Sequence, residues 1–420
     1  MRRCKFLAIG LFSVICLQTK AQKIATFEVQ LPAATSGLTI PASIDLNDIT
    51  FIKDSSLVLQ EVTGSAVKNI PYQIMQGDRR TIYWSVENDG KIKKRTYQLV
   101  KGTPATFSHI AADNKDGALT IQAGNKNLLR YVFTKDYPPA GVDSSYARSG
   151  FIHPLWTPGG QELTRIQAPD HYHHYGIWNP WTHVLFEGDT LDFWNIGGRR
   201  ARATVRFAKF ISVTNGDVFS EFEALHEHVV LKDKQGNGPE KVALNELQTV
   251  RVYKPEGNDG SYFLVDITSK LSCATQSPFH ILAYRYAGLG WRTTGFWDNN
   301  NCEVLTSEGK TRANTDNTSA RWCIVQGALP DNSYGGAVML SYPGNYNHPE
   351  PMRIWTLNTN GRGDMFANFS PTKDIDWVLE PGKTYVLKYR FVVFTGKFDK
   401  AKAESAWQYF AAPPKVTVKK

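Results

Sequence analysis

Histidine is the side chain best suited to bind a metal ion or exchange a proton near neutral pH, and this sequence concentrates it in one segment. Five of the ten histidines lie within residues 153–183. They are His153, His171, His173, His174 and His183. Such a cluster favours a divalent metal site or metal-free acid–base catalysis. The simpler alternative is that the imidazoles only satisfy buried backbone groups.

The densest part of this cluster is the run HYHHYGIW at residues 171–178. Pro169, Gly176 and Pro180 do not allow a continuous helix, so we expect a strand edge or a loop. The zinc-protease pattern, two histidines one helical turn apart with a glutamate between them, is absent. Any metal site must therefore be assembled from a strand or loop.

Alternation along a strand puts His171 and His173 on one face and His174 on the other. Two imidazoles on one face make a partial metal site, which a further histidine or a carboxylate must complete. His183 is the histidine that we expect there, and Asp170 is the alternative carboxylate. The predicted ligands of a divalent ion are therefore His171, His173 and His183.

Acid–base catalysis without a metal would draw on the same segment. Its predicted groups are His153, His171, His173, His174 and the nearby Arg165. Two later segments add predicted substrate-binding groups, Arg292 in GWRTTGFWDNN and His348 in NYNHPEP. Arginine can clamp a carboxylate or polarise a sugar oxygen. Ordinary surface pairing with Asp and Glu is the competing interpretation of each arginine.

Tryptophan is enriched in and just after the histidine segment. The four indoles there belong to Trp156, Trp178, Trp181 and Trp194. A flat indole stacks on the apolar face of a sugar ring, while neighbouring polar groups bind the hydroxyls. We therefore predict that Trp156, Trp178 and Trp181 bind substrate, with Trp178 and Trp181 forming the platform. The alternative is that they fill the core of a large β-sandwich.

Two common kinds of active site have no support in the sequence. It contains no glycine-rich phosphate loop and no dinucleotide fingerprint after a strand. A Gly-x-Ser-x-Gly elbow is also missing, which argues against a serine hydrolase of that type.

The first residues resemble an export signal. A basic start, Arg2, Arg3 and Lys5, precedes an apolar stretch too short to span a bilayer, and cleavage is predicted before Gln22. Removing residues 1–21 lowers the formal net charge from +9 to +5. We therefore expect a periplasmic or extracellular protein that is not membrane-embedded. The remaining charge forms no basic stripe with interleaved aromatics, so no nucleic-acid partner is expected.

Three cysteines remain after that cleavage, namely Cys273, Cys302 and Cys323. Since the number is odd, at least one thiol is free, and a disulfide framework is not the main source of stability.

The elements that must position the histidines read as strands. Segments 27–31, 82–86, 203–207 and 385–394 are alternating or rich in aromatic and β-branched residues. A single short helix is expected at 400–410, with Asp399 as its N-cap.

We therefore predict an all-β protein in which a small β-sandwich at 23–110 precedes a larger β-sandwich domain at 118–412. Segments 136–160 and 298–316 are expected to be long, strand-poor loops of the larger domain.

Several stretches resemble the secreted bacterial family filed as "methane oxygenase PmoA-like". They are SGFIHPLWTPGG, HYHHYGIWNPWTHVLFEG, DFWN, YPGNYNHPEPMRIW and LEPGKTYVLKYRFVVFTG, and the resemblance covers about residues 118–412. The family name is not taken as the function, because the true methane monooxygenase subunit of that name spans the membrane. The resemblance implies an uncharacterised domain common in bacteria that degrade polysaccharides.

The closing stretch is also similar to galactose-mutarotase-like supersandwich domains, which bind sugars in a groove lined with His, Arg, Trp and acidic residues. This similarity implies an exported carbohydrate-active protein, an enzyme of lyase or hydrolase type acting on an oligosaccharide or polysaccharide fragment. One alternative is a non-catalytic glycan-binding module of a polysaccharide-utilisation system. A further alternative is a metal-dependent oxidoreductase.

Overall fold

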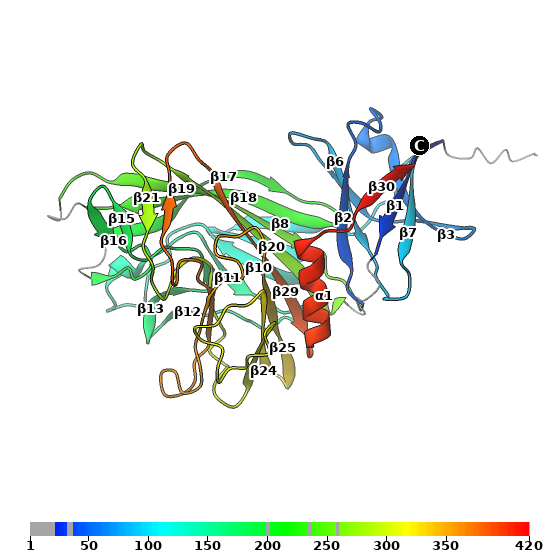
Figure 1. The fold of residues 1–420 in the computed structure, drawn as a ribbon. Helices are drawn as coiled ribbons and strands as arrows, with labels where there is room; N and C mark the ends of the chain where they lie inside the picture. The colour runs from blue at the N-terminus through cyan, green and yellow to red at the C-terminus, as the bar shows by residue number, and fades with distance from the viewer. Residues whose placement is uncertain (1–21, 32–36, 199–201, 233–236, 258–259, 420) are drawn as a thin grey trace, which may run out of the picture.

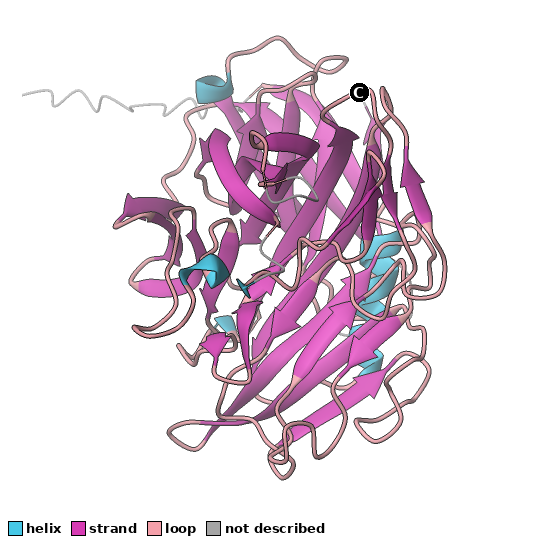
Figure 2. Ribbon diagram, turned by 90° about the vertical axis from the view of Figure 1, so that its left-hand side faces the viewer, coloured by secondary structure: helices cyan, strands magenta, loops and turns pink. Residues whose placement is uncertain are grey.

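The computed structural model describes residues 22–31, 37–198, 202–232, 237–257 and 260–419. The predicted export signal, residues 1–21, lies outside the described residues. Almost all of the regular structure consists of β-strands (Figures 1 and 2), so the prediction of an all-β fold is confirmed. The predicted strands at 27–31, 82–86, 203–207 and 385–394 all lie within or overlap observed strands.

The N-terminal part of the chain forms two small sheets around their own core. The first sheet contains, in spatial order, β30 (Val416–Lys419), β1 (Lys23–Gln30), β7 (Lys94–Lys101), β3 (Leu57–Thr63) and β4 (Ala66–Asn69). The second contains β2 (Ile40–Asp45), β6 (Thr81–Val86) and β5 (Tyr72–Met75). Phe27, Trp84 and Tyr97 pack between the sheets, with ring centroids 5.8 and 5.5 Å from that of Trp84. The small sandwich thus includes one strand from the far C-terminus.

The larger part of the chain is built on two eight-stranded sheets, which we call the site sheet and the long-strand sheet. The site sheet contains β26 (Met352–Ile354), β27 (Phe366–Phe369), β22 (Gly290–Arg292), β14 (Ile177–Trp178), β11 (Phe151–Leu155), β10 (Lys126–Val132), β9 (Ala118–Ala123) and β8 (Ile110–Lys115). The long-strand sheet contains β17 (Ala203–Thr214), β18 (Phe219–Val230), β19 (Lys241–Tyr253), β20 (Tyr262–Cys273), β29 (Tyr385–Thr395), β25 (Ser333–Ser341), β24 (Trp322–Leu329) and β23 (Cys302–Thr306).

The main core lies between these two sheets. Tyr131 and Trp291 reach it from the site sheet, and Phe222, Val250 and Phe391 reach it from the long-strand sheet. Strand β18 shows why the sequence folds this way, since its buried and half-buried residues alternate over most of its length. The apolar face of each sheet is therefore buried against the other, as in other β-sandwiches.

Two smaller sheets complete the large domain. A four-stranded sheet contains β16 (Asp189–Leu191), β15 (Val184–Phe186), β21 (Phe279–Ile281) and β28 (Trp377–Leu379). A two-stranded hairpin contains β12 (Ile166–Ala168) and β13 (His171–Tyr175). Short 3-10 turns occur at Asp54–Ser56 and Ser144–Tyr146. The hairpin carries most of the histidine segment.

Helix α1 (Lys400–Ala411) lies beside the long-strand sheet and leads the chain back to β30 (Figure 1). The Asp399 side chain accepts a hydrogen bond from the Lys402 backbone N–H at 2.8 Å, which confirms the predicted N-cap. Ala403, Ala406 and Phe410 are buried and pack with residues of the long-strand sheet. The helix therefore ties the large domain to the chain end that completes the small sandwich.

The expectation of two strand-poor loops is only partly correct. Segment 136–160 contains strand β11, and segment 298–316 contains strand β23. The three cysteines at 273, 302 and 323 are all free thiols. Among the helices in the described part of the chain, none is long and apolar enough to cross a membrane.

Candidate functional site

The histidine hairpin covers the outer face of the site sheet, the face turned away from the main core. On β14, β22 and β27 the residues that alternate with core residues point to this outer face; they are Trp178, Arg292 and Phe366. Together with Tyr175 and Trp355, the aromatic members of this group form a buried cluster under β13. This cluster gives the hairpin a rigid floor.

A bulge in the hairpin gathers the histidines, and it overturns the expectation that they alternate. Strand register pairs Ala168 with His171 and Ile166 with Tyr175. The three residues 172–174 therefore stand opposite the single residue Gln167, whose φ is 48°. A bulge locally breaks the alternation of side chains. The prediction that His174 faces away from His171 and His173 is therefore wrong.

The imidazoles of His171, His173 and His174 form a compact group, which we call the three-histidine site. One ring nitrogen from each can be chosen so that all three atoms lie within 4.8 Å of one another. Ring centroids are 4.6 Å apart for His171 and His174 and 4.7 Å apart for His173 and His174. Ligand nitrogens of a tetrahedral zinc ion lie about 3.4 Å apart, so small rotations of these side chains would bring the three nitrogens onto one divalent cation.

Burial keeps two of these imidazoles in the neutral form that binds metal. Burial, with added repulsion from the nearby charges of His171 and Arg148, lowers the pKa of His173 to about 3. Burial is also the main cause that holds the pKa of His174 well below its usual value. His174 is 1% exposed, and its Nδ1 atom is buried without a hydrogen-bond partner in the described structure. Such an orphaned nitrogen is costly to bury unless something binds it.

Asp170 lies directly behind the site. Its carboxylate is 2.8 Å from Nδ1 of His171 and accepts hydrogen bonds from Arg292 at 3.0 Å and from Asn360 at 2.8 Å; the shortest ion-pair distance to Arg292 is 2.8 Å. Burial acts to raise the pKa of Asp170. The His171 hydrogen bond and the charges of Arg292 and Arg165 outweigh it and hold this pKa well below its usual range. Asp170 is therefore an ionised carboxylate that fixes the His171 ring.

Arginines and a second carboxylate surround Asp170. Arg165 lies 3.1 Å from Asp170, and both Arg165 and Arg292 lie 3.5 Å from Asp364. Arg292 is 1% exposed, its guanidinium carbon is 4.5 Å from the Trp355 ring centroid, and its Nη1 is buried without a partner in the described structure. Burial, followed by the charge of Arg165, lowers the pKa of Arg292 to about 10. The predicted residues Arg165 and Arg292 thus lie beside the three-histidine site, where both contact the carboxylate that bonds His171.

Three residues of this site had no role in the sequence-based prediction. Asp364, Asn360 and Trp355 come from a segment about 190 residues after Asp170. None of them stands in a local pattern with the histidines. They lie in the loop between β26 and β27, and these two strands bring the loop to the site because they lie at the end of the site sheet beside β22.

The tryptophans predicted to form a sugar platform are placed in the interior instead. Trp178 is 2% exposed in the cluster beneath His174, and Trp181 is 0% exposed in the main core. The structure therefore corrects their predicted role, because a buried indole has no free face for a sugar. Trp156 is half-buried and bridges to Glu162 away from the three-histidine site.

The other predicted histidines also lie outside the site. His183 is exposed, has a φ of 46° and packs against Tyr284 in a tilted arrangement with ring centroids 4.0 Å apart. It is not in the cluster of His171, His173 and His174, so the structure does not bring this predicted ligand to the other two.

His153 and His348 have local partners of their own. His153 bonds Thr164 at 2.9 Å, and burial lowers its pKa to about 4. His348 lies 3.1 Å from the Ser341 hydroxyl and stacks near Trp407 of helix α1. The predicted catalytic role of His153 and the predicted substrate contact of His348 receive no support from this placement.

Comparison with known proteins gives a family and distant structural likenesses. No curated protein matches the sequence. One solved structure, a protein in glycosyl hydrolase family 38 from Enterococcus faecalis, has a TM-score of 0.46 and 10% identity, covering 96% of this chain and 49% of that one. Another, a heparan sulfate lyase from Pedobacter heparinus, has a TM-score of 0.30 and 11% identity, covering 71% and 38%.

The chain thus spans about half the length of the first of these structures, and such low similarity transfers no function. The match to a sequence family is more specific. It begins at Ala118 in strand β9 and ends at residue 408 in helix α1, so it includes the whole three-histidine site. The chain belongs to the family described as "Family of unknown function (DUF6807)", whose model matches residues 118–408.

Proposed function

We propose that the three-histidine site binds a divalent transition-metal ion and that the protein uses it to act on a carbohydrate. The observation that carries this proposal is the convergence of three imidazole ligand atoms within 4.8 Å. Three protein ligands with an open fourth position are typical of catalytic rather than structural zinc sites. A bound cation supplies Lewis acidity toward an oxygen of the substrate.

The surrounding residues support the metal part of the proposal. Low pKa values keep His173 and His174 unprotonated, as metal ligands must be. The Nδ1 atom of His171 is hydrogen-bonded to Asp170, so Nε2 of His171 is the ring nitrogen that can bind the metal ion. A carboxylate behind a ligating histidine fixes the ring and increases the basicity of the ligand. The group therefore has a supporting layer as well as the ligands.

The carbohydrate part rests on the groups beside the histidines. Tyr146 and Tyr172 are half-buried, with ring centroids 5.8 Å apart, and the Tyr146 ring lies 6.5 Å from His173. Their rings can pack on a sugar, whereas Arg165 and Asn360 can bind its oxygens. The glycan-binding alternative depended on Trp178 and Trp181, whose burial removes that support.

The acting groups differ in role. Arg165, whose side chain is 24% exposed, can bind and orient a carboxylate or hydroxyl oxygen of the substrate, whereas the buried Arg292 is paired with Asp170. Asp170 and Asp364 hold these arginines in place. Lyase and hydrolase chemistry are both compatible with this set.

Export is a further part of the proposal. The backbone carbonyl of Gln22, the first described residue, accepts a hydrogen bond from Lys101 at 2.8 Å, so the sheet of the small sandwich starts directly after the predicted cleavage point. Sequencing the N-terminus of the protein recovered outside the cytoplasm tests this, with Gln22 as the expected first residue.

Activity on a panel of oligosaccharides tests the function. The protein is stripped with a chelator and reloaded with zinc, manganese or iron, and each form is assayed for released reducing ends and for unsaturated products. His171→Ala and His173→Ala are expected to lose activity, whereas His183→Ala, at an exposed histidine outside the cluster, is expected to retain it. Equal activity of all three variants would contradict the proposal.

A further inference from the structure

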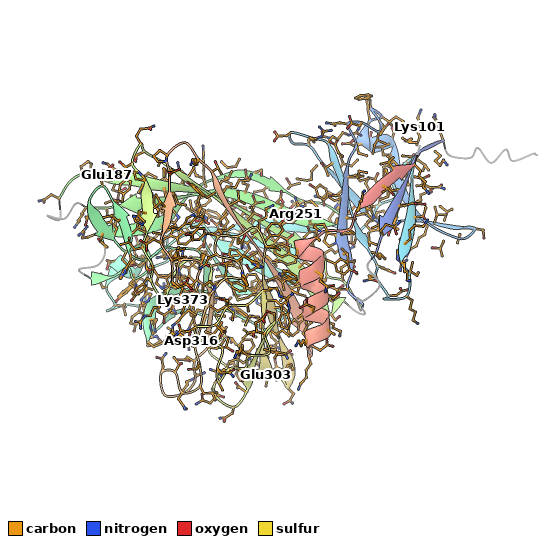
Figure 3. All side chains as sticks on the ribbon, viewed as in Figure 1. Lys101, Glu187, Arg251, Glu303, Asp316 and Lys373 are labelled. Carbon is orange, nitrogen blue, oxygen red and sulfur yellow. The ribbon has the colours of Figure 1, made fainter. Side chains whose placement is uncertain are left out.

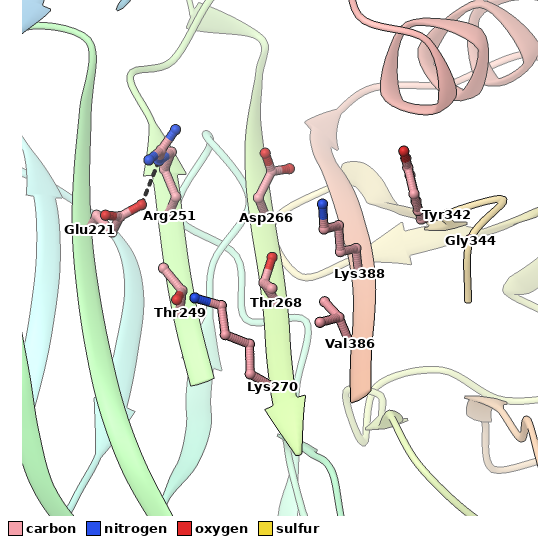
Figure 4. A pocket seen from close by; sticks show the side chains of 10 residues that line it. All are labelled: Glu221, Thr249, Arg251, Asp266, Thr268, Lys270, Tyr342, Gly344, Val386 and Lys388. Atoms are coloured by element: carbon pink, nitrogen blue, oxygen red, sulfur yellow. Dashed lines mark hydrogen bonds and ion pairs between the residues drawn. The ribbon is translucent and has the colours of Figure 1, made fainter. Parts of the chain in front are cut away.

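A second polar groove lies on the opposite side of the large domain. Its cavity of about 540 Å³ has residues of β18, β19, β20 and β29 as its floor and Tyr342 at its side (Figure 4). These four strands belong to the long-strand sheet, and the groove lies on the face that is turned away from the main core. The three-histidine site lies on the outer face of the other sheet, so the core separates the two places.

Most of the charge at one end of this groove is internally neutralised. Glu221, Arg251, Asp266 and Arg390 stand side by side across four neighbouring strands in register. Arg251 bonds Glu221 at 2.6 Å, and Arg390 bonds Asp266 at 2.5 and 2.7 Å. The signs alternate along this row, so it is a self-contained ion-pair ladder with little remaining capacity for an external ion.

The next rows across the same strands carry two lysines and one carboxylate, Glu223 on the far strand β18, which accepts a hydrogen bond from Thr249 at 3.1 Å. Thr268 is paired in register with Lys388, and Lys270 lies two residues further along β20. Neither Lys270 nor Lys388 forms an ion pair within the described part of the chain. The Lys388 ammonium lies 5.1 Å from the Tyr342 ring centroid. Lys270 and Lys388 are therefore diagonal neighbours on adjacent strands, and such neighbours are about 7–8 Å apart. Their two positive charges face the same groove.

The groove continues toward the small sandwich with an aromatic lining. A neighbouring cavity of about 290 Å³ shares Arg251, Thr268 and Lys388 with the first and adds Tyr83, from β6 of the small sandwich. The guanidinium carbon of Arg251 lies 4.8 Å from the Tyr83 ring centroid and 4.0 Å from that of Phe219. Arg251 lies on the part of the large domain nearest the small sandwich (Figure 3).

We infer that this groove, which we call the lysine groove, binds an acidic oligosaccharide whose sugars bear carboxylates. The lysines would receive the carboxylates, the threonine hydroxyls would bond ring hydroxyls, and the tyrosines would pack against sugar faces. An anionic occupant fits because neither ammonium group forms an ion pair within the described residues, whereas Glu221 and Asp266 are already paired with arginines. The inference concerns a site distinct from the three-histidine site and stands or falls without it.

Calorimetric titration of the protein with a galacturonic acid hexasaccharide tests this inference. The fully methyl-esterified hexasaccharide is the neutral counterpart, and polyglutamate of similar charge is the non-sugar counterpart. The acidic hexasaccharide is expected to bind, more weakly as salt increases, and the methyl ester is expected to bind at least about tenfold more weakly, because charge-assisted hydrogen bonds are the stronger ones.

Matched variants locate the binding. The double variant Lys270→Gln, Lys388→Gln is expected to bind the acidic hexasaccharide roughly tenfold or more weakly than wild type. A tenfold loss of affinity corresponds to the loss of about one charge-assisted contact. The pair Lys115→Gln and Lys126→Gln removes the same charge from exposed positions on β8 and β10 and should leave binding unchanged. His183→Ala, at an exposed histidine outside both sites, should also leave it unchanged.

Three results would overturn the inference. The wild-type protein fails to bind the acidic hexasaccharide, or the Lys270→Gln, Lys388→Gln variant binds it as well as wild type does. In the third case polyglutamate binds as tightly as the hexasaccharide, which would make the groove a general polyanion site rather than a sugar site.

Discussion

The Nδ1 atom of His171 lies 2.8 Å from a carboxylate oxygen of Asp170, the residue that precedes it in the chain. Two neighbours along a strand would normally point to opposite faces. They meet here because Pro169 and Asp170 form the two-residue turn of the β12–β13 hairpin, so that Asp170 stands outside the strand. The turn therefore provides the carboxylate and the strand provides the imidazoles of one site.

Removal of the Asp170 charge should weaken metal binding. We expect Asp170→Asn to reduce affinity for zinc by about 10- to 100-fold, as is typical of a carboxylate that supports a ligating histidine. Competition against a chromogenic chelator measures this. Asp374→Asn, at an exposed carboxylate bonded to Asn347, is the matched control. If both variants bind zinc equally well, Asp170 has no part in the site.

Gly176 should be intolerant of a side chain. Its φ is 54°, and a Cβ atom there would lie 2.1 Å from the carbonyl oxygen of Ile152 on strand β11. We expect Gly176→Ala to separate β13 and β14 from β11, with loss of metal affinity and a destabilisation well above about 1 kcal/mol.

The control for this substitution is Gly124→Ala. Gly124 has a similar φ of 61° but no atom within 4 Å of the added Cβ. Its cost should therefore be only the backbone strain, about 1 kcal/mol. Denaturant unfolding of both variants separates the two effects, and equal losses would show that the close approach at Gly176 does not matter.

Trp181 should act in stability and not in sugar binding. Since it is fully buried against the main core, with Trp377 as a ring neighbour at 5.9 Å, Trp181→Ala is expected to cost about 3–5 kcal/mol of unfolding free energy. The half-buried Trp156 offers the comparison, with a smaller expected loss in Trp156→Ala. If the Trp181→Ala protein were fully stable but bound glycans more weakly, Trp181 would be a sugar-binding residue and not a core residue.

Glu350 should make stability depend on pH. It is fully buried and accepts hydrogen bonds from Ser341, Asn345 and Tyr389, none of which is a cation. Burial raises its pKa from 4.5 to about 7, against the lowering effect of those hydrogen bonds. Because the folded state binds this proton more tightly than the unfolded state, its contribution is favourable below pH 4.5 and is lost as the pH rises to about 7.

The Glu350→Gln variant isolates this effect, since glutamine does not titrate. The difference in unfolding free energy between wild type and variant should shift against wild type by on the order of 3 kcal/mol between pH 4.5 and 7 and then level off. Urea unfolding at several pH values measures it. A difference that stays constant over this range would mean that Glu350 is ionised throughout.

The strand pattern was predictable because alternating burial leaves a direct trace in the sequence. The same holds for helix α1, whose N-cap Asp399 is a local signal. The bulge opposite Gln167 has no such signal, and it decides that His174 joins His171 and His173. The sequence could therefore predict which segment is functional but not the ligand set within it.

The rest of the site could not be predicted because it comes from distant strands. Asn360 reaches Asp170, and Asp364 reaches Arg292, only because β27 pairs with β22, which pairs with β14. The burial of Trp178 and Trp181 has the same origin, since either a sugar platform or a core would select the same indoles. Composition distinguishes those two roles poorly, whereas the position of the strand in the sheet decides between them.

The most direct test of the metal site is the metal content of the protein purified without a polyhistidine tag. Elemental analysis should find close to one equivalent of a divalent transition metal per chain after equilibration and desalting. The metal should be lost in His171→Ala and in His174→Ala and retained in His183→Ala. The identity of the bound metal distinguishes a Lewis-acid centre from a redox centre. Absence of bound metal from the wild-type protein, or its full retention in His171→Ala and His174→Ala, would contradict the account.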